Sequence, residues 1–167
     1  MTPLPAALGG TDLVAWRIDR ERYAETWDSG EGAFLYGGRW NNKGVRAVYC
    51  AIDPATALLE VAVHVTFPTM DTVPHVLTAV KIIDPAAVHV VQPPDIPDPA
   101  WLHPGVETPA QRAYGDDLIA EHGIIVLPSV VSTESWNLIF DPEAASYEKV
   151  SQRPLVIDPR LHPAGQP

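Results

Sequence analysis

Apolar residues along the chain fall in short runs, and most of these runs predict β-strands. Stretches rich in β-branched, aromatic and other apolar residues occupy 13–18, 47–51, 73–83, 88–91, 124–127 and 136–140. A further short strand is expected near residue 152. A glycine-rich segment at 29–44 and a proline-rich connection at 92–99 are expected to be loops. The pattern therefore predicts an α+β fold in which strands predominate.

Two segments carry the signals of helices. Asp53-Pro54 supplies an N-cap and a first-turn proline for a helix over 55–65. Thr108-Pro109 opens a second helix, which is closed by His122-Gly123. The first of these helices is apolar on nearly all sides, as is typical of a helix that is mostly buried.

Polar residues interrupt the first helix at a spacing of four, at Thr56, Glu60 and His64. This spacing places them in one narrow stripe, which faces either water or a polar cavity. Because an uncompensated carboxylate is costly to bury, Glu60 favours the cavity, with an exposed helix face as the alternative.

The chain of 167 residues fits a single domain with one core. We expect a leader over 1–12, one compact domain over 13–158 and a flexible tail over 159–167. The sequence has neither a long apolar span nor the start of a signal peptide. Its one cysteine, Cys50, excludes an internal disulfide and reads as a small buried core residue. These features predict a cytoplasmic protein with no membrane contact.

The net charge of −10, from 21 acidic and 11 basic residues, restricts the classes of partner that we expect. Such a chain repels phosphate backbones, so direct binding of nucleic acid is not expected. An anionic substrate would need local positive charge from the few arginines.

Several classes of enzyme lack their sequence signals here. The chain has no phosphate-binding Walker loop, no Gly-x-Ser-x-Gly elbow and no dinucleotide-type glycine motif. Its six histidines are scattered without the spacing of metal ligands, so no metal is expected. Asp116 and Asp117 are expected to be solvated charges.

The segment Tyr36–Gly44 has the composition of an anion-binding loop. Paired glycines at 37 and 38 allow close approach of the backbone to a ligand, and Arg39 follows with its fork of donors. A tight turn with a surface arginine is the alternative. Tyr49, on the strand that leads to the Glu60 helix, could stack on a flat heterocycle or fill the core.

These residues resemble the RES domain family, the toxins of RES–Xre toxin–antitoxin modules. The resemblance extends from about residue 13 to 145. It rests on these motifs in order: Trp16-Arg17-Ile18, Gly37-Gly38-Arg39-Trp40-Asn41 with Gly44, Tyr49-Cys50-Ala51, Ala57-Leu58-Leu59-Glu60, Gly115-Asp116, Pro128-Ser129-Val130-Val131, Asn137, and Asp141-Pro142.

The resemblance implies a fold similar to ADP-ribosyltransferase toxins, with a β-core, flanking helices and an NAD⁺ cleft. It implies degradation of NAD⁺, with water or phosphate as acceptor, or transfer of ADP-ribose to a protein. NAD⁺ would be the substrate, and no further cofactor is implied. The implied partner is an Xre-like helix-turn-helix antitoxin that fills the cleft.

The family's functional arginine, tyrosine, glutamate and serine fall on Arg39, Tyr49, Glu60 and Ser129, with Ser132 as the alternative hydroxyl. Glu60 would stabilise the developing ribosyl cation, and Arg39, helped by Arg17, would grip the diphosphate. Further residues expected to bind NAD⁺ are Gly38, Trp40, Asn41 and Asn137.

Three functions remain open at this point. The first is a toxin that cleaves the nicotinamide–ribose bond of NAD⁺. An ADP-ribosyltransferase acting on a host protein would use the same residues. The third is a non-enzymatic interaction module whose acidic surface docks a basic partner.

Overall fold

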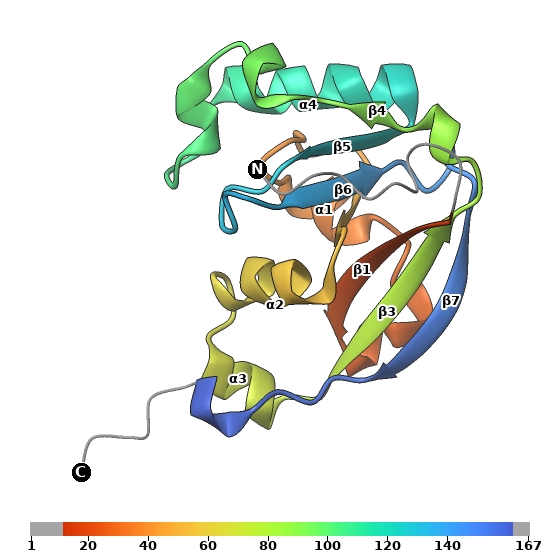
Figure 1. Cartoon of the computed structure of the whole chain (residues 1–167), viewed down its shortest axis with the longest axis vertical. Coiled ribbons are helices and arrows are strands. Elements are labelled where there is room, and N and C mark those ends of the chain that lie inside the picture. The colour runs from red at the N-terminus through yellow and green to blue at the C-terminus, as the bar shows by residue number, and fades with distance from the viewer. Residues whose placement is uncertain (1–11, 162–167) are drawn as a thin grey trace.

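The β-strands of the computed structural model, which describes residues 12–161, form one seven-stranded sheet in the order β4-β5-β6-β2-β1-β3-β7 (Figure 1). The expected leader, apart from Asp12, and the last six residues of the tail lie outside the described residues. The strands are β1 (Leu13–Arg20), β2 (Val48–Ala51), β3 (His75–Ile82), β4 (His89–Val90), β5 (Ile124–Pro128), β6 (Trp136–Phe140) and β7 (Tyr147–Pro154). The predicted strands and the α+β class are confirmed.

Two halves of this sheet meet along a very short seam. β1 and β2 are paired only at Trp16 and Ala51, whereas β1 pairs with β3 along its whole length from Leu13 to Arg20. All pairings are antiparallel except that of β4 with β5. The half-sheet β1-β3-β7 therefore diverges from the half-sheet β4-β5-β6-β2, as Figure 1 shows.

Helices lie around both halves. The α-helices are α1 (Glu31–Tyr36), α2 (Pro54–Ala62), α3 (Phe67–Thr72) and α4 (Pro109–His122). Short 3-10 helices are η2 (Glu21–Thr26), η3 (Pro85–Ala87), η4 (Pro93–Asp95), η5 (Pro99–Leu102) and η6 (Pro159–Leu161). In Figure 1, α4 lies along β4 and β5, while α2 and α3 lie beside the other half-sheet. None of the helices within 12–161 has the length and apolar character of a membrane span.

The two predicted helices begin at their predicted caps. The Asp53 carboxylate accepts a hydrogen bond from the backbone N–H of Thr56 at 2.8 Å, and the Thr108 hydroxyl accepts one from Gln111 at 3.1 Å. Gly123 ends α4 with φ of 72°. The predicted extent of α2 is wrong at its C-terminus, because the helix ends at Ala62.

The expectation that α2 is mostly buried is also wrong. Leu59 of α2 and Val63, which directly follows the helix, are 40% and 58% exposed, whereas only Thr56 and Ala57 of the helix are buried. Leu59 faces the solvent, and Val63 lies at the edge of a cavity. Apolar composition alone could not distinguish this exposed rim from a core-facing side.

Two short helices were not predicted. α1 lies within the segment expected to be a loop, and none of its residues is buried, so it leaves no apolar periodicity in the sequence. α3 buries only Met70 and has a proline, Pro68, in its first turn. Both are six residues long, which is too short for a periodic signal.

The core is divided among three clusters of buried side chains. One fills the face of the sheet that Trp27 covers, the second lies between the sheet and α4, and the third lies beneath α2 and α3. Cys50 is buried in the first cluster, as predicted. Burial raises the pKa of its thiol to about 12, so the sulfur stays protonated near neutral pH.

Candidate active site

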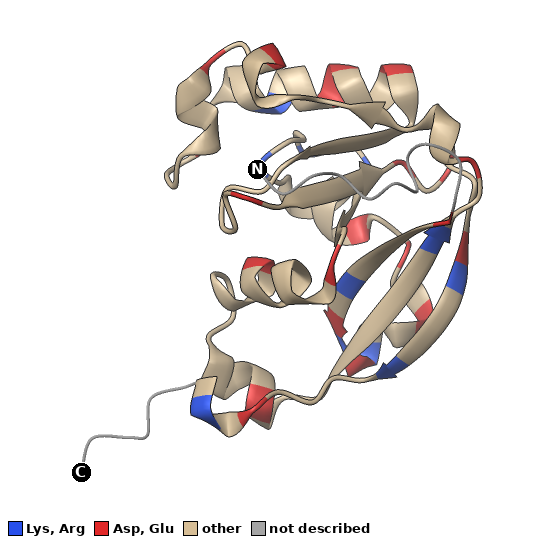
Figure 2. Cartoon of the chain, viewed as in Figure 1, with Lys and Arg blue, Asp and Glu red and all other residues tan. Residues whose placement is uncertain are grey.

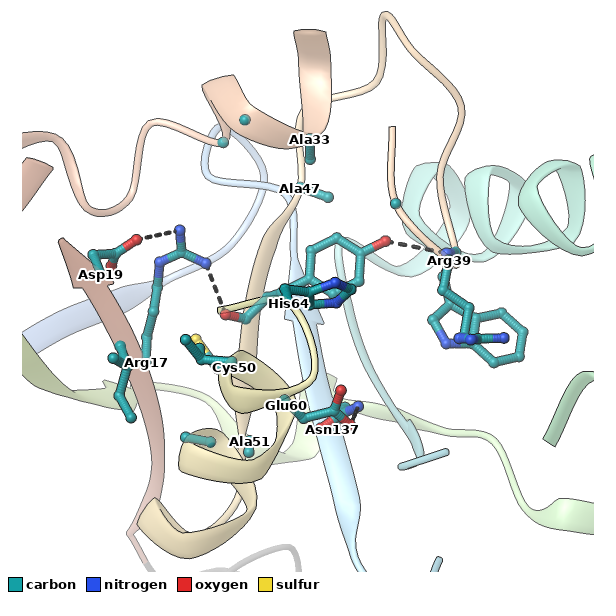
Figure 3. Close-up of a pocket in the computed structure, with 18 of the residues that line it drawn as sticks. Arg17, Asp19, Ala33, Arg39, Ala47, Cys50, Ala51, Glu60, His64 and Asn137 are labelled. Carbon is teal, nitrogen blue, oxygen red and sulfur yellow. Dashed lines mark hydrogen bonds and ion pairs between the residues drawn. The ribbon is translucent and has the colours of Figure 1, made fainter. Parts of the chain in front are cut away.

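A cavity of about 740 Å³ opens where the two half-sheets diverge. Its walls come from β1, β2, α1, α2 and the loop that follows β5. This volume lies within the range of sites for small-molecule ligands. Figure 3 shows Arg17 and Asp19 on one side of the cavity and Arg39 on the other, with Glu60, His64 and Asn137 between them.

The glycine-rich turn that leads to Arg39 is closed by the side chain of Tyr49. The Tyr49 hydroxyl accepts a hydrogen bond from the backbone N–H of Trp40 at 3.1 Å and donates one to Asn41 Oδ1 at 2.7 Å. A Cβ at Gly38 would lie 2.6 Å from the Tyr49 hydroxyl oxygen, so only glycine fits this position. Gly38 thus allows the turn to pack closely against Tyr49, while Gly37 adopts a positive φ of 76°.

Burial raises the pKa of Tyr49 far above its ordinary value. Its hydroxyl is therefore neutral, and its hydrogen bonds hold the turn. The ring lines the cavity, where it can contact a ligand. Both alternatives considered for Tyr49, core packing and a face toward a ligand, apply to this one side chain.

Asn41 is completely buried and does not line the cavity. Its side-chain amide donates to the carbonyl oxygens of Ala33, Asn42 and Val45 at 2.9–3.2 Å. These contacts join α1 to the turn. Asn41 therefore stabilises the wall of the cavity without lining it. Its position does not support the expected contact with NAD⁺.

The turn is also attached to α4. The Asp116 carboxylate accepts hydrogen bonds from the backbone N–H of Asn42 at 3.0 Å and from its side-chain amide at 2.7 Å. The expectation that Asp116 is merely solvated is therefore wrong. One residue earlier, a Cβ at Gly115 would collide with the carbonyl group of Trp40. The adjacent pair Gly115-Asp116 thus allows α4 and the turn to pack closely.

Arg39 is half-buried at the side of the cavity opposite Arg17. Its Nη2 donates to the carbonyl oxygen of Gly105 at 3.1 Å, so other guanidinium donors are available to a ligand. Nearby, Glu107 accepts a hydrogen bond from Arg112 at 2.8 Å. That hydrogen bond lowers the pKa of Glu107, which also lines the cavity.

Glu60 projects from α2 into the cavity and is held by two side chains. Its Oε1 accepts hydrogen bonds from the Ser129 hydroxyl at 2.6 Å and from Asn137 Nδ2 at 2.7 Å. Ser129 Oγ in turn accepts a hydrogen bond from the backbone N–H of Ser132 at 2.9 Å. Of the two candidate serines, Ser129 is thus the one bonded to Glu60, although it does not itself line the cavity.

The three members of the polar stripe of α2 lie in different surroundings. Thr56 is buried, and its hydroxyl contacts Asp53 at 2.6 Å and Ser135 at 2.7 Å. Glu60 faces the cavity, and His64 lies exposed at its opening. Of the two alternatives for Glu60, the structure therefore supports the polar cavity.

Arg17 bridges the gap between the half-sheets. Its Nη1 donates to the carbonyl oxygen of Tyr49 at 2.9 Å, and its Nη2 forms an ion pair with Asp19 Oδ1 at 2.7 Å. Burial raises the pKa of Asp19 above its ordinary value, and the neighbouring Arg17 offsets this only in part. Sequence reasoning missed Asp19, although its alternate spacing from Arg17 on a strand places both on one face.

The cavity brings together most of the residues singled out in the sequence. Of the nine residues predicted to be catalytic or to bind NAD⁺, seven line it, namely Arg17, Gly38, Arg39, Trp40, Tyr49, Glu60 and Asn137. Ser129 and Asn41 do not line the cavity, but each forms a hydrogen bond with a residue that does, Glu60 and Tyr49 respectively. Within the described residues, no three His, Cys, Asp or Glu side chains are grouped so as to hold a metal ion.

Comparison with known proteins finds similar sequences and a similar fold. The family model described as "RES domain" matches residues 14–158. A "Toxin Res" of Photorhabdus laumondii is 32% identical, over 89% of this chain and 97% of that protein. A "Prs ADP-ribosylating toxin" of a Sphingobium species is 30% identical, over 87% and 94%.

A similar fold occurs in the crystal structure of the M. tuberculosis MbcT–MbcA toxin–antitoxin complex. The TM-score is 0.70 at 18% sequence identity, and the match covers 86% of this chain and 84% of that one. At this low sequence identity, the similarity shows that the two proteins share a fold and nothing further.

Proposed function

This chain belongs to the RES domain family, and from that premise we propose that it is the toxin of a bacterial toxin–antitoxin pair that cleaves the nicotinamide–ribose bond of NAD⁺. The observation that carries the proposal is the placement of Glu60. A carboxylate fixed by Ser129 and Asn137 faces a cavity of ligand size, with a guanidinium on either side.

Glycosidic cleavage of NAD⁺ passes through a ribose that resembles an oxocarbenium ion. Glu60 stabilises the positive charge on this sugar, and its orientation is set before the substrate arrives. Arg39 binds the diphosphate, for which its planar fork of donors is suited. The bond between C1 of the ribose and the ring nitrogen breaks, its electron pair stays on nicotinamide, and this neutral leaving group needs no protonation.

In the hydrolytic form of the reaction, the oxygen of water bonds to C1, and the proton that water loses is released to solvent. The products are nicotinamide and ADP-ribose. Phosphate as acceptor would instead yield phosphorylated ADP-ribose, and both outcomes use the same binding residues.

A second candidate is transfer of ADP-ribose to a protein. It is favoured by the relative named as an ADP-ribosylating toxin, which matches nearly the whole chain. The bond that breaks in NAD⁺ is the same, and only the acceptor differs.

One experiment tests these alternatives. The purified chain is incubated with NAD⁺ labelled in the adenine, with and without phosphate and with a bacterial lysate. Free ADP-ribose indicates hydrolysis, phosphorylated ADP-ribose indicates phosphorolysis, and label on protein indicates transfer. Intact NAD⁺ in every reaction would contradict an enzymatic role and favour an interaction module.

The proposed partner is an Xre-like antitoxin. Support comes from the family and from the complex in which the similar fold occurs. Co-expression with the product of a neighbouring helix-turn-helix gene should yield a stable complex without NAD⁺ cleavage.

A further inference from the structure

Glu107 brings a carboxylate to the end of the cavity where Arg39 lies. The carbonyl oxygen of Gly105 accepts a hydrogen bond from Arg39 Nη2 at 3.1 Å, and Glu107, two residues later, lines the cavity. Both residues belong to the segment between η5 and α4. Arg112 of α4 donates to Glu107 Oε1 at 2.8 Å. The carboxylate is therefore held in a fixed position close to the guanidinium of Arg39.

This carboxylate is both charged and accessible. The hydrogen bond from Arg112 lowers the pKa of Glu107, and the positive charges of Arg112 and Arg39 add to this effect, so the side chain is ionised near neutral pH. The side chain is 31% exposed, so a ligand in the cavity can contact it. An ionised carboxylate only accepts hydrogen bonds, and it repels further negative charge. Glu107 therefore favours hydroxyl groups over anions at this place.

The order of charged residues across the cavity indicates which part of NAD⁺ Glu107 contacts. Figure 3 shows Glu60 between Arg17 and Arg39. If Glu60 faces the nicotinamide ribose and Arg39 the diphosphate, the next group along the substrate is the ribose of adenosine. Its 2′ and 3′ hydroxyl groups are hydrogen-bond donors. Glu107, whose segment contacts Arg39, is placed to accept from them.

NADP⁺ differs from NAD⁺ at this ribose alone. Its 2′-phosphate replaces a hydroxyl donor by a group that carries a charge of about −2 near neutral pH. A carboxylate beside the ribose would lose a hydrogen bond to NADP⁺ and would repel the added phosphate. Dinucleotide-binding proteins of an unrelated fold use a carboxylate in this way to bind the 2′-hydroxyl of NAD⁺.

We propose that Glu107 makes the enzyme select NAD⁺ over NADP⁺, by accepting a hydrogen bond from the adenosine ribose and by repelling a 2′-phosphate. The inference rests on the proposed cleavage of NAD⁺. It assigns to Glu107 a role in specificity that is separate from the chemistry assigned to Glu60. Arg112, which holds Oε1 of Glu107, acts through it as a positioning residue.

The test compares three dinucleotides: NAD⁺, NADP⁺ and the nicotinic acid analogue of NAD⁺. The specificity constant kcat/KM is measured at one ionic strength by chromatography of the released base. We expect the wild-type protein to prefer NAD⁺ over NADP⁺ at least about tenfold, and Glu107→Gln to reduce this preference at least about threefold, because glutamine keeps an oxygen acceptor but lacks the charge. The ratio between NAD⁺ and the acid analogue should stay unchanged, since that analogue carries its added charge at the other end of the molecule.

Glu31→Gln is the matched control, because Glu31 also lines the cavity but lies at the start of α1. It should keep both ratios. Glu107→Lys, which reverses the charge, should reduce the preference for NAD⁺ further than Glu107→Gln does. A preference that neither variant of Glu107 changes would overturn the proposal. An equal change in both ratios, or an equal effect of Glu31→Gln, would show a general effect of charge and would likewise overturn it.

Binding of ADP-ribose and of its 2′-phosphate, measured by calorimetry, separates this proposal from the proposed activity. Suppose that no dinucleotide is cleaved but ADP-ribose binds in preference to its 2′-phosphate, and that Glu107→Gln abolishes the preference. The role of Glu107 in specificity then stands and the proposed reaction fails. Equal cleavage of NAD⁺ and NADP⁺ by the wild-type protein, with equal binding of the two ADP-ribose compounds, overturns that role and leaves the reaction standing. Absence of both cleavage and binding overturns both.

Discussion

Glu60 is a charged residue on a largely apolar helix, and two neighbouring side chains hold its carboxylate in place. Ser129 and Asn137 both bond to Oε1, and glutamine would keep an oxygen acceptor there while removing the charge. Glu60→Gln should therefore reduce NAD⁺ turnover by about 100-fold or more, because the transition state loses its stabilising charge. The melting temperature should change little.

Glu143→Gln is the matched control, since Glu143 is exposed between β6 and β7. Turnover and melting temperature are measured on the same preparations. If Glu60→Gln retained full turnover, Glu60 would have no part in the chemistry.

Arg39 offers a second test at the level of one side chain. Lysine keeps the positive charge but cannot present two parallel donors to a diphosphate. Arg39→Lys should lower kcat/KM for NAD⁺ at least about tenfold, equivalent to about 1.4 kcal/mol. Arg160→Lys, at an exposed position of η6, should leave it unchanged. Equal activity of the two variants would make Arg39 a structural residue of the turn.

The sequence predicts the site well where a residue's chemistry conflicts with its local pattern. Glu60 within an apolar helix and Arg39 after paired glycines are such cases, and both line the cavity. Asp19, which also lines the cavity, gives a weaker signal, because only its alternate spacing from Arg17 on a strand relates the two residues. For Asn41, proximity to Arg39 in the sequence does not reveal that the side chain is completely buried, and its contact with NAD⁺ stays a prediction.

At the scale of elements, the position of α2 determines where Glu60 points. Asp53 caps this helix and also accepts a hydrogen bond from the Ser135 hydroxyl at 2.9 Å, which ties α2 to the start of β6. Asp53→Ala should lower the free energy of unfolding by about 1–2 kcal/mol, the range for loss of an N-cap. Denaturant unfolding near pH 7 measures the change.

The effect of Asp53 should depend on pH. Partial burial opposes its ionisation, but hydrogen bonds from Thr56 and Ser135 outweigh this and hold its pKa below the ordinary value. The stabilisation is therefore present above the ordinary carboxyl pKa and is lost as the pH falls through the lowered one. The difference between wild type and Asp53→Ala should shrink in that acidic range, and a constant difference would contradict the capping role.

Close packing of α4 on the Arg39 turn gives a further prediction. A Cβ at Gly115 would collide with backbone atoms of Trp40, which cannot move without moving the turn. Gly115→Ala should destabilise the protein by about 1–3 kcal/mol through overpacking and should raise KM for NAD⁺.

Gly32→Ala is the control for this substitution, because Gly32 lies in α1 and, apart from its chain neighbours and the backbone of its own helix, no atom lies within 4 Å of its Cβ position. Alanine is favoured over glycine inside a helix, so this variant should be as stable as wild type or slightly more so. The melting temperatures of both variants are measured. An unchanged melting temperature for Gly115→Ala would contradict the packing argument.

Elements with strong local signals were predicted, and elements without them were not. Caps located the starts of α2 and α4, and alternating or apolar runs located the strands. α1 has no buried residue, so its formation depends on Asn41 and on contacts such as that of Arg46 with the Phe34 ring. Local pattern cannot reveal a helix held mainly by such long-range contacts.

On the scale of the whole molecule, the division of the sheet is the feature that sequence could not reveal. The seam between β1 and β2 consists of one residue pair, whereas neighbouring seams are several residues long. Strand propensity says nothing about which strands pair or where pairing stops. The cavity exists because pairing stops there.

Charge is also distributed unevenly over the molecule. Figure 2 shows acidic residues along α4, while many basic residues lie on β1, β3 and β7. With a net charge of −10, the molecule as a whole repels an anionic substrate, so the proposed binding of NAD⁺ requires local positive charge such as that of Arg39 within the cavity. An acidic exterior around such a site suits a basic protein partner better than a nucleic acid.

Expression of the chain without a partner tests the proposal in the cell. If it cleaves NAD⁺, even a modest turnover number, on the order of 10 per second, would consume a millimolar pool within minutes once the protein reaches micromolar concentration. Growth should stop, and cellular NAD⁺ should fall at least about tenfold before viability is lost. Glu60→Gln, expressed to the same level, should allow growth and leave NAD⁺ unchanged, whereas Glu143→Gln should behave like the wild-type chain. Growth arrest with a normal NAD⁺ concentration would contradict depletion and favour modification of a host protein, because a single modified target consumes little NAD⁺.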